Sequence, residues 1–393
     1  MAEHEAATLT PASVQAAADL CSPGDTVVMP AGDAATWSSI VYIPVGVNLK
    51  GQGVDSTIIR QPSTTNRFFY FNSASTTHGY TVEIQGFTCV GPSGVIDTPT
   101  WPTSTGTGFA IEVRNSTVLI HDVNLHNKNY GFVMRSCSGV IYDCAFRWMI
   151  NNYSTATHGS GGYGVAVEPV SGTWPIEYPA FGSGDALFIE DCTFYGCKHA
   201  IASNGGKVYV ARYNTISAGW YVHGCLDAHG KRGTTEGAIS TEYYHNDVYL
   251  ATQTAYSDSG TINYGVLHRG GQAVIWNNAF HSGAGTSSDA IVISPVDITD
   301  AGTYVFPDDY PIYWQPRNVW IWGNTYDGAA VDAYENSAWF EEDRSSTNSM
   351  GTYYDYVNSA KSGYVDYVYP HPLRPTAGGG TYKMMHGVKV KLV

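Results

Sequence analysis

Apolar and polar positions alternate along most of the chain, and the alternation returns in one repeated phrase. The phrase has alternating apolar residues, then a small polar residue, then a large apolar one, as in VLIHDVNL, LFIEDCTF and AVIWNNAF. Alternation with a period of two predicts β-strands, and no stretch after residue 30 keeps a helical period. The final apolar residues of seven such phrases are Leu125, Phe146, Phe194, Ile216, Val248, Phe280 and Tyr326.

The spacing of these phrases predicts a solenoid. Successive final residues are 21, 48, 22, 32, 32 and 46 positions apart, so a minimum of 21–22 residues recurs with variable additions. A coil of that length, whose short strands stack on the next coil, describes a parallel β-helix with inserted loops. We therefore expect an all-β fold with a solenoid over 26–330 and an irregular segment over 331–393 that packs back on it.

Two further patterns fit this solenoid. PASVQAAADLC begins at Pro11, has Thr10 or Ser13 as a cap, and predicts a short amphipathic helix. Within an N-terminal arm over 1–25, this helix is expected to cover the open end of the solenoid. An asparagine also recurs at one position of four phrases, where stacked side chains can bond along the axis as scaffold. These residues are Asn214, Asn246, Asn278 and Asn324.

The chain resembles a known superfamily in several places. The stretch GDTVVMPAGDAATWSSIVYIPVGVNLKGQGVDSTIIRQ resembles the opening of pectate-lyase-like proteins. FIEDCTF, VYVARYNTI, DAHG and the tail YVDYVYPHPLR resemble uncharacterised bacterial and phage members, and the resemblance covers most of residues 20–375. It implies a right-handed, single-stranded parallel β-helix. Because that superfamily includes lyases, hydrolases, epimerases and phage tailspikes, the resemblance leaves the activity open.

Composition narrows the class of protein. The chain has 20 Lys and Arg against 34 Asp and Glu, a net charge of −14 that argues against nucleic-acid binding. No apolar run approaches the length of a membrane helix, about 18 residues. The first residues, MAEHEAATLTPASV, lack the features of a signal peptide. We therefore expect either a secreted protein whose signal has been removed or a virion-associated protein.

Cofactor and metal motifs are missing from the sequence. The seven cysteines have no zinc-site spacing, so we expect mostly buried thiols, with one or two disulfides possible. There is no phosphate-binding glycine loop and no metalloprotease helix. A calcium site is possible, but no dense run of Asp and Glu supports one.

Three long insertions interrupt the repeat, at 91–107, 151–184 and 295–317. They are rich in aromatic residues, and loops of this length inside a compact fold usually serve a function or are disordered. Trp174 and Trp314 are candidates for stacking on sugar rings. An equally good interpretation is that these rings only pack their own loops.

Positive charge gathers in the middle of the chain, around YVHGCLDAHGKRG at 221–233. Asp227 and His229 are two residues apart, so on a strand they share one face. His229 is the candidate base, oriented by Asp227 or Glu242, and Lys231 is a second candidate base. The remaining candidates are Arg212 as a catalytic residue and, for substrate binding, Arg232, Arg269, His223, His245 and Glu190.

The repeat alignment refines two of these predictions. It places Glu190 and Arg212 at one position of adjacent coils, where they are expected to pair. That pair is either part of a site or a ladder of charges with a structural role only. Arg212, Glu242 and Arg269 are expected to be neighbours of Asp227 and His229.

Three functions are compatible with these residues. β-Elimination on a polysaccharide containing uronic acid needs a cation for the sugar carboxylate, a base and a proton donor, which arginine and histidine can supply. Hydrolysis needs two carboxylates, but the residues lack the full motif set of polygalacturonase-like hydrolases. The third function is non-catalytic: a glycan-binding or tailspike-like structural protein, which could be a homotrimer.

Overall fold

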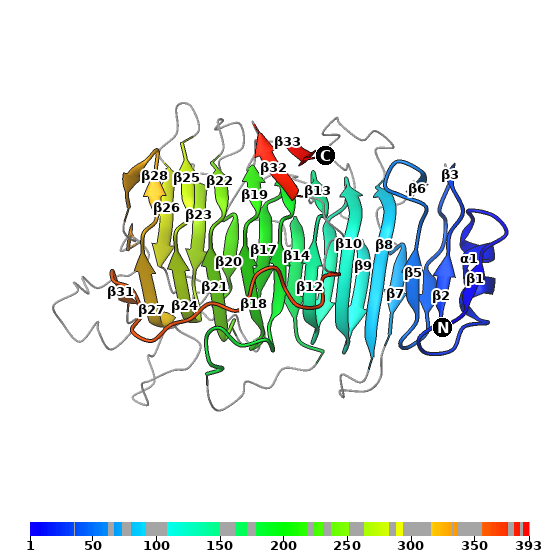
Figure 1. Ribbon diagram of the computed structural model, residues 1–393, viewed down its shortest axis with the longest axis horizontal. Coiled ribbons are helices and arrows are strands. Elements are labelled where there is room, and N and C mark those ends of the chain that lie inside the picture. The colour runs from blue at the N-terminus through cyan, green and yellow to red at the C-terminus, as the bar shows by residue number, and fades with distance from the viewer. Residues whose placement is uncertain are drawn as a thin grey trace, which may run out of the picture.

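The computed structural model shows one long solenoid of stacked coils (Figure 1). It describes residues 1–34, 36–61, 67–72, 80–91, 108–149, 162–170, 178–217, 224–230, 237–250, 263–282, 288–293, 316–331, 334–335, 356–375, 381–385 and 388–392. Within these residues nearly all regular structure is β, and the strands of neighbouring coils pair in parallel. The predicted right-handed parallel β-helix is confirmed.

A bent sheet, which we call sheet A, forms two sides of each coil. Its first side holds β2 (Thr26–Val28), β5 (Asn48–Lys50), β12 (Ser138–Tyr142), β15 (Leu187–Glu190), β18 (Val208–Arg212), β21 (Ser240–Tyr244), β24 (Gly271–Trp276), β27 (Pro316–Trp322) and β31 (Tyr356–Val357). Its second side holds β3 (Gly32–Ala34), β6 (Thr57–Arg60), β13 (Ala145–Arg147), β16 (Thr193–Tyr195), β19 (Thr215–Ser217), β22 (Asp247–Tyr249), β25 (Ala279–His281) and β28 (Thr325–Tyr326). The long strands β8 (Thr81–Val90) and β10 (Thr117–His126) run through both sides.

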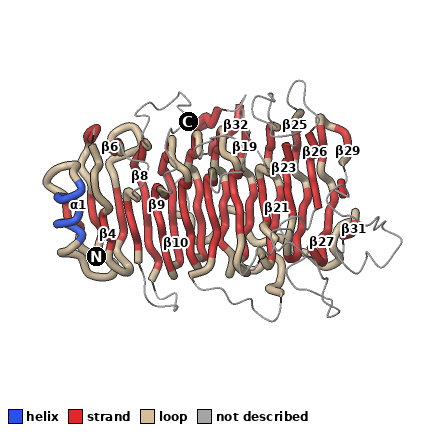
Figure 2. The backbone as a smooth tube through the Cα atoms, turned by 180° about the vertical axis from the view of Figure 1, so that it is seen from behind, coloured by secondary structure: helices blue, strands red, loops and turns tan. Residues whose placement is uncertain are grey.

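The third side of each coil is a separate parallel sheet, sheet B. Its strands are β4 (Val41–Ile43), β7 (Phe69–Phe71), β9 (Phe109–Arg114), β11 (Tyr130–Arg135), β14 (Tyr163–Glu168), β17 (His199–Ser203), β20 (Leu226–Ala228), β23 (Asn263–His268), β26 (Ser288–Ile293) and β30 (Tyr334–Glu335). Three short additions complete the strands: β1 (Glu3–Glu5) on β2, β29 (Ala329–Ala330) on β28, and a hairpin of β32 (Thr381–Met385) and β33 (Val388–Leu392). Figure 2 shows the same stack from behind.

The bend in sheet A explains the repeated phrase of the sequence. A corner residue in the left-handed conformation separates the two sides, as at Asp191 (φ 54°) and His245 (φ 56°). The residue that follows each corner points inward, and in four coils it is one of the predicted asparagines. Asn246 Nδ2 donates to Asn278 Oδ1 at 2.9 Å, and Asn214 Nδ2 donates to Asn246 Oδ1 at 3.0 Å. The expected asparagine ladder is confirmed.

Apolar residues alternate into the solenoid and form one continuous core. Phe146 and Phe194 stack on adjacent coils with ring centroids 4.6 Å apart. All seven cysteines are free thiols and six of them are buried, so the disulfides that the sequence left open are absent. Among the described residues, no helix is long and apolar enough to cross a membrane.

Helix α1 (Pro11–Ala18) lies at the N-terminal end of the stack (Figure 1). Its cap is Thr10, whose side chain accepts a hydrogen bond from the backbone of Ser13. The helix buries Val14, Ala17 and Ala18 in the same core as the strands. The predicted capping helix therefore forms and covers apolar side chains at the first coils.

Residues 356–375 cross the outer face of sheet A, as the orange and red segment of Figure 1 shows. Tyr364 donates to Glu242 on β21, and the carbonyl of Tyr367 accepts from Arg212 on β18. Arg374 packs its guanidinium over Tyr142 on β12, with 4.3 Å to the ring centroid. We call these residues the C-terminal strap, because they bind strands of at least four coils.

Candidate active site on the outer face of sheet B

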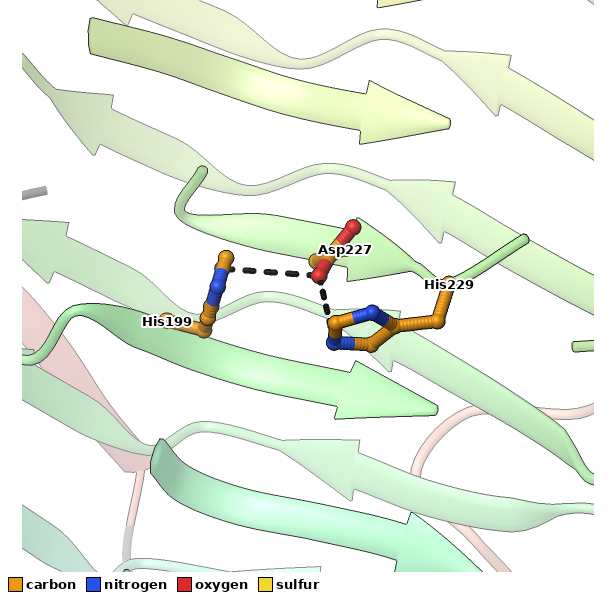
Figure 3. A group of neighbouring side chains, drawn as sticks. All are labelled: His199, Asp227 and His229. Atoms are coloured by element: carbon orange, nitrogen blue, oxygen red, sulfur yellow. Dashed lines mark ion pairs between the residues drawn. The ribbon is translucent and has the colours of Figure 1, made fainter. Parts of the chain in front are cut away.

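Four charged or polar side chains meet on the outer face of sheet B. Asp227 points outward from β20, between Ala202 of β17 and Leu267 of β23. His199 begins β17 (Figure 3). His229 and Arg269 each follow directly after a strand, β20 and β23, and their backbones continue the same stacking. Parallel register of three adjacent coils thus brings together residues separated by up to 70 positions in sequence.

Asp227 is the centre of this cluster. Arg269 binds it through two nitrogens, with Nε 3.1 Å from Oδ1 and Nη2 2.6 Å from Oδ2. His229 Nε2 lies 3.0 Å from Oδ2, and His199 Nδ1 lies 3.6 Å from the same oxygen. Asp227 is fully buried, whereas 17% of the His229 side chain is exposed. His229 is therefore the member of the cluster that faces outward.

Electrostatics keep Asp227 ionised. Its complete burial opposes the charged form, but the positive charge of Arg269, with smaller effects of His229 and His199, outweighs burial and holds the pKa of Asp227 well below its usual value. A buried carboxylate with this many donors is a fixed negative charge at neutral pH.

The same contacts fix the protons of both imidazoles. Arginine only donates, so the 2.8 Å contact from Arg269 Nη2 makes His229 Nδ1 an acceptor. The proton of neutral His229 is then on Nε2, which donates to Asp227. His199 Nδ1 lies 2.7 Å from the carbonyl oxygen of Gly224 and donates to it. His229 is thus a neutral imidazole with its basic nitrogen next to a guanidinium.

A tyrosine completes the cluster. The Tyr163 hydroxyl on β14 lies 3.5 Å from His229 Nε2, and the Tyr163 ring packs against His199 with centroids 4.9 Å apart. Tyr163 and His199 occupy one position of adjacent strands, in the sequences YGVAVE and HAIAS. The sequence did not predict either residue as part of the site, and β14, which holds Tyr163, lies within the insertion expected over 151–184. The sequence pattern that marks them is a tyrosine or histidine followed by a small residue and an apolar residue, at the start of the sheet B strand in both coils.

His199, Asp227 and His229 could offer three ligand atoms to a metal, since these atoms lie within 4.8 Å of one another. The guanidinium of Arg269 already lies 2.6 Å from the carboxylate and 2.8 Å from His229, and its charge would repel a cation. Calcium also needs six to eight oxygen ligands, and this group has one carboxylate. The donor set therefore fits an ion-paired acid–base site better than a metal site.

Three of the predicted site residues lie elsewhere, on the outer face of sheet A: Glu190, Arg212 and Glu242. The expectation that Glu190 and Arg212 pair is confirmed, with 2.6 Å between Arg212 Nε and Glu190 Oε2. Both side chains are fully buried. Arg212 also donates to the carbonyls of Tyr367 and Val368 of the C-terminal strap, at 2.6 and 2.9 Å.

The expectation that Arg212 and Glu242 are neighbours of Asp227 is wrong. Arg212 and Glu242 are on β18 and β21 of sheet A, whereas Asp227 is on β20 of sheet B. The two groups therefore project from different sides of the coil. Glu242 accepts hydrogen bonds from Gly182 N at 2.8 Å and Tyr364 at 2.6 Å. Burial, opposed by these donors, raises the pKa of Glu242.

The other predicted residues have three different outcomes. Arg269 is next to Asp227, as expected. His245 is at a corner of sheet A, stacked on Tyr213 with centroids 5.0 Å apart, and burial lowers its pKa. The remaining candidates lie outside the described residues: Lys231, Arg232, His223, Trp174 and Trp314.

Comparisons with known proteins identify only solved structures. No protein-family description and no curated protein matches the chain. An alginate lyase from Paenibacillus sp. str. FPU-7 is 15% identical over 85% of this chain and 91% of its own, with a TM-score of 0.44. A family 28 exopolygalacturonase from Yersinia enterocolitica is 13% identical over 83% and 65%, with a TM-score of 0.46.

A tailspike protein of E. coli bacteriophage HK620, solved in complex with a pentasaccharide, is also similar. It is 14% identical over 83% of this chain, with a TM-score of 0.47. The chain spans 53% of the length of that tailspike. At these identities the likenesses concern the fold alone.

Proposed function

We propose that the protein is a polysaccharide lyase that cleaves a glycan containing uronic acid by β-elimination at the His229 site. The observation that carries this proposal is one arrangement: a neutral imidazole that is 17% exposed, fixed by a buried Asp–Arg pair, lies 3.5 Å from a tyrosine hydroxyl. A base and a proton donor at this separation can act on two positions of one sugar unit. The substrate would be met outside the cell or on a virion.

The chemical steps balance within this group of residues. The carboxylate of the sugar binds the guanidinium of Arg269. The hydrogen bond from that guanidinium to Nδ1 of His229 is thereby broken, and Nδ1 takes the C5 proton. The C5–H electron pair forms the C4–C5 double bond, and the bond from C4 to the glycosidic oxygen breaks. Tyr163 donates its proton to that oxygen. The Nδ1 proton of the resulting imidazolium then passes through solvent water to the Tyr163 oxygen, which restores the phenol and leaves His229 with its proton on Nε2 as at the start.

Hydrolysis is supported less well by the described residues. Of the two carboxylates near His229, Asp227 is fully buried and bound by Arg269, so it cannot activate water. Glu168, which is 19% exposed, is paired with Arg135 at 2.8 Å and lacks a second available carboxylate opposite it among the described residues. Glu190 and Glu242 are buried on sheet A, where the C-terminal strap covers them. An inverting hydrolase needs two carboxylates with room for water between them. The non-catalytic function predicts binding without turnover, which the same experiment detects.

The test is incubation with a panel of alginate, polygalacturonate and neutral glycans while ultraviolet absorbance of the new conjugated double bond is recorded. We expect absorbance to rise with an acidic glycan, and His229→Ala and Tyr163→Phe each to lower turnover by about 10²–10⁴-fold. His281→Ala, on the second side of sheet A, is the matched control and should retain turnover. Reducing ends without absorbance would favour hydrolysis, and no reaction with any glycan would favour a binding protein.

A further inference from the structure

A second charged cluster lies on the same outer face of sheet B, nearer the N-terminal end. Glu112 points outward from β9, and its side chain is fully buried by three arginines. Arg67 Nε lies 2.7 Å from Oε2, Arg114 Nη2 lies 2.7 Å from Oε1, and Arg135 Nε lies 2.9 Å from Oε1. Arg135 also contacts Glu168 Oε2 at 2.8 Å. We call Arg67, Arg114 and Arg135 the arginine cluster.

The arginine cluster presents positive charge to solvent. Three guanidinium groups face two carboxylates, so the local balance is 3 − 2 = +1 in a chain whose net charge is −14. The arginine side chains are 31%, 29% and 24% exposed, whereas Glu112 is fully buried. Glu112 therefore lies beneath the guanidinium groups, whereas Glu168, with 19% of its side chain exposed, lies beside Arg135. Burial also raises the pKa of Glu168.

Aromatic rings hold two of the guanidinium groups in place. Arg67 Cζ lies 5.0 Å from the centroid of Phe109 and 5.2 Å from that of Tyr70. Arg114 Cζ also lies 5.2 Å from the centroid of the Tyr70 ring. Such contacts fix a guanidinium without using its hydrogen-bond donors. The cluster is thus oriented before any ligand arrives, which lowers the entropy cost of binding.

The strand register relates the arginine cluster to His229. Arg135 pairs with Glu168 on the next coil, and two further coils along the same outer row lead to His229. Three coil steps correspond to about 14 Å along the axis. The neighbouring row over this distance contains small or apolar residues, Val133, Ala166 and Ala202. The arginine cluster and His229 therefore lie along one straight line of sheet B, beside a row of buried small or apolar residues.

We propose that the arginine cluster is a second glycan subsite, which binds a carboxylate of the same acidic polysaccharide chain whose reacting unit meets His229. The inference rests on the proposed function for its ligand class, and it adds the direction of the chain along the solenoid axis. A sugar unit advances a glycan by a distance similar to one coil step, so about three units separate the two subsites. The guanidinium fork matches a carboxylate, and a local positive patch offsets the repulsion of a polyanion by the acidic body.

The experiment measures binding separately from cleavage. In a His229→Ala background, calorimetry gives the affinity for disaccharides and hexasaccharides of mannuronate, guluronate and galacturonate. Arg67→Gln and Arg114→Gln should each weaken hexasaccharide binding about tenfold and leave disaccharide binding unchanged. Arg114→Lys keeps the charge and loses the fork, so it should lie between these. Arg147→Gln, exposed on the second side of sheet A, removes a guanidinium elsewhere and should have no effect.

The outcomes separate this inference from the proposed function. Hexasaccharide affinity that ignores Arg67 and Arg114 overturns the subsite. Arginine-dependent binding without wild-type turnover supports the subsite and overturns the lyase. No binding of any uronate oligomer overturns both. If an arginine variant fails to fold, the His229→Ala protein with its arginine cluster intact decides the question. Its preference for hexasaccharide over disaccharide should be large at low salt and should decrease as NaCl screens the cluster. A preference that does not change with salt overturns the subsite.

Discussion

Replacing Arg269 by methionine tests whether the Asp227 cluster is held by charge. The change keeps most of the volume of the side chain and removes two hydrogen bonds to Asp227, at 3.1 and 2.6 Å. A hydrogen bond to a charged group contributes about 1.5–3 kcal/mol net, so the two together give about 3–6 kcal/mol. Breaking a buried pair by removing one partner costs about 3–5 kcal/mol, which agrees. We therefore expect Arg269→Met to lose about 3–5 kcal/mol of unfolding free energy at neutral pH.

The pH dependence gives this prediction its sign. In the wild type the pKa of Asp227 is lowered, so the stability it contributes is present above the unfolded pKa of about 3.9 and is lost as the pH falls through the folded pKa. Without Arg269, burial prevails and raises that pKa above the unfolded value. The variant should then lose stability as the pH rises from mildly acidic to neutral, which is the opposite slope.

The assay is urea unfolding of wild type, Arg269→Met, Asp227→Asn and the double variant, at mildly acidic and neutral pH. Asp227→Asn removes the buried charge, so the double variant should be more stable than Arg269→Met at neutral pH and should lack the reversed slope. Equal stability of Arg269→Met and wild type at both pH values would refute the reasoning. A double variant that is weaker than Arg269→Met would refute the assignment of the cost to an uncompensated Asp227.

Two further predictions concern the scaffold. Asn246→Ala removes the hydrogen bonds from Nδ2 to Asn278 Oδ1 and Ala211 O, both 2.9 Å, and should lower the unfolding free energy by about 2–4 kcal/mol in urea unfolding. Asp247→Asn, at the neighbouring exposed position, is the control. A loss of stability no larger than that of the control would contradict the role of the ladder. Burial opposes the charged form of His121, but Asp122 and Glu83 outweigh it and raise its pKa to about 9, so its contribution is complete below about pH 6.5 and is lost as the pH rises through 9. Allowing for solvent screening this is about 1–2 kcal/mol, and His121→Gln should abolish that part of the pH profile; an identical profile would contradict the assignment.

The sequence predicted the parts of the fold that repeat. Alternation and spacing located the strands on both sides of sheet A, and the recurrent asparagines located the corner between them. Alignment on the corner also predicted the Glu190–Arg212 pair, because each of the two residues directly precedes a corner residue, Asp191 or Tyr213. These predictions succeeded because each depends on the register of adjacent coils, which a short repeat expresses directly.

The surroundings of Asp227 did not follow from the same repeat. The alignment referred to sheet A, and the third strand of the coil carries no comparable phrase, so nothing indicated that Asp227 and Glu242 face different sides. The C-terminal strap was expected to pack back, but its partners were hidden, since Tyr367 and Arg212 are 155 positions apart. Contacts of that range depend on a path of the chain that no local pattern encodes.

Burial distinguishes the Asp227 cluster of sheet B from the Glu190–Arg212 pair of sheet A. Arg212 and Glu190 are fully buried, and backbone groups of the C-terminal strap occupy both of them. On sheet B, Asp227 is equally buried, but it contacts His229, whose side chain remains 17% exposed. A ligand can reach an ionised network only through a member that faces outward. The outer face of sheet B therefore holds the accessible histidine, and sheet A uses charged residues of the same types to attach its strap.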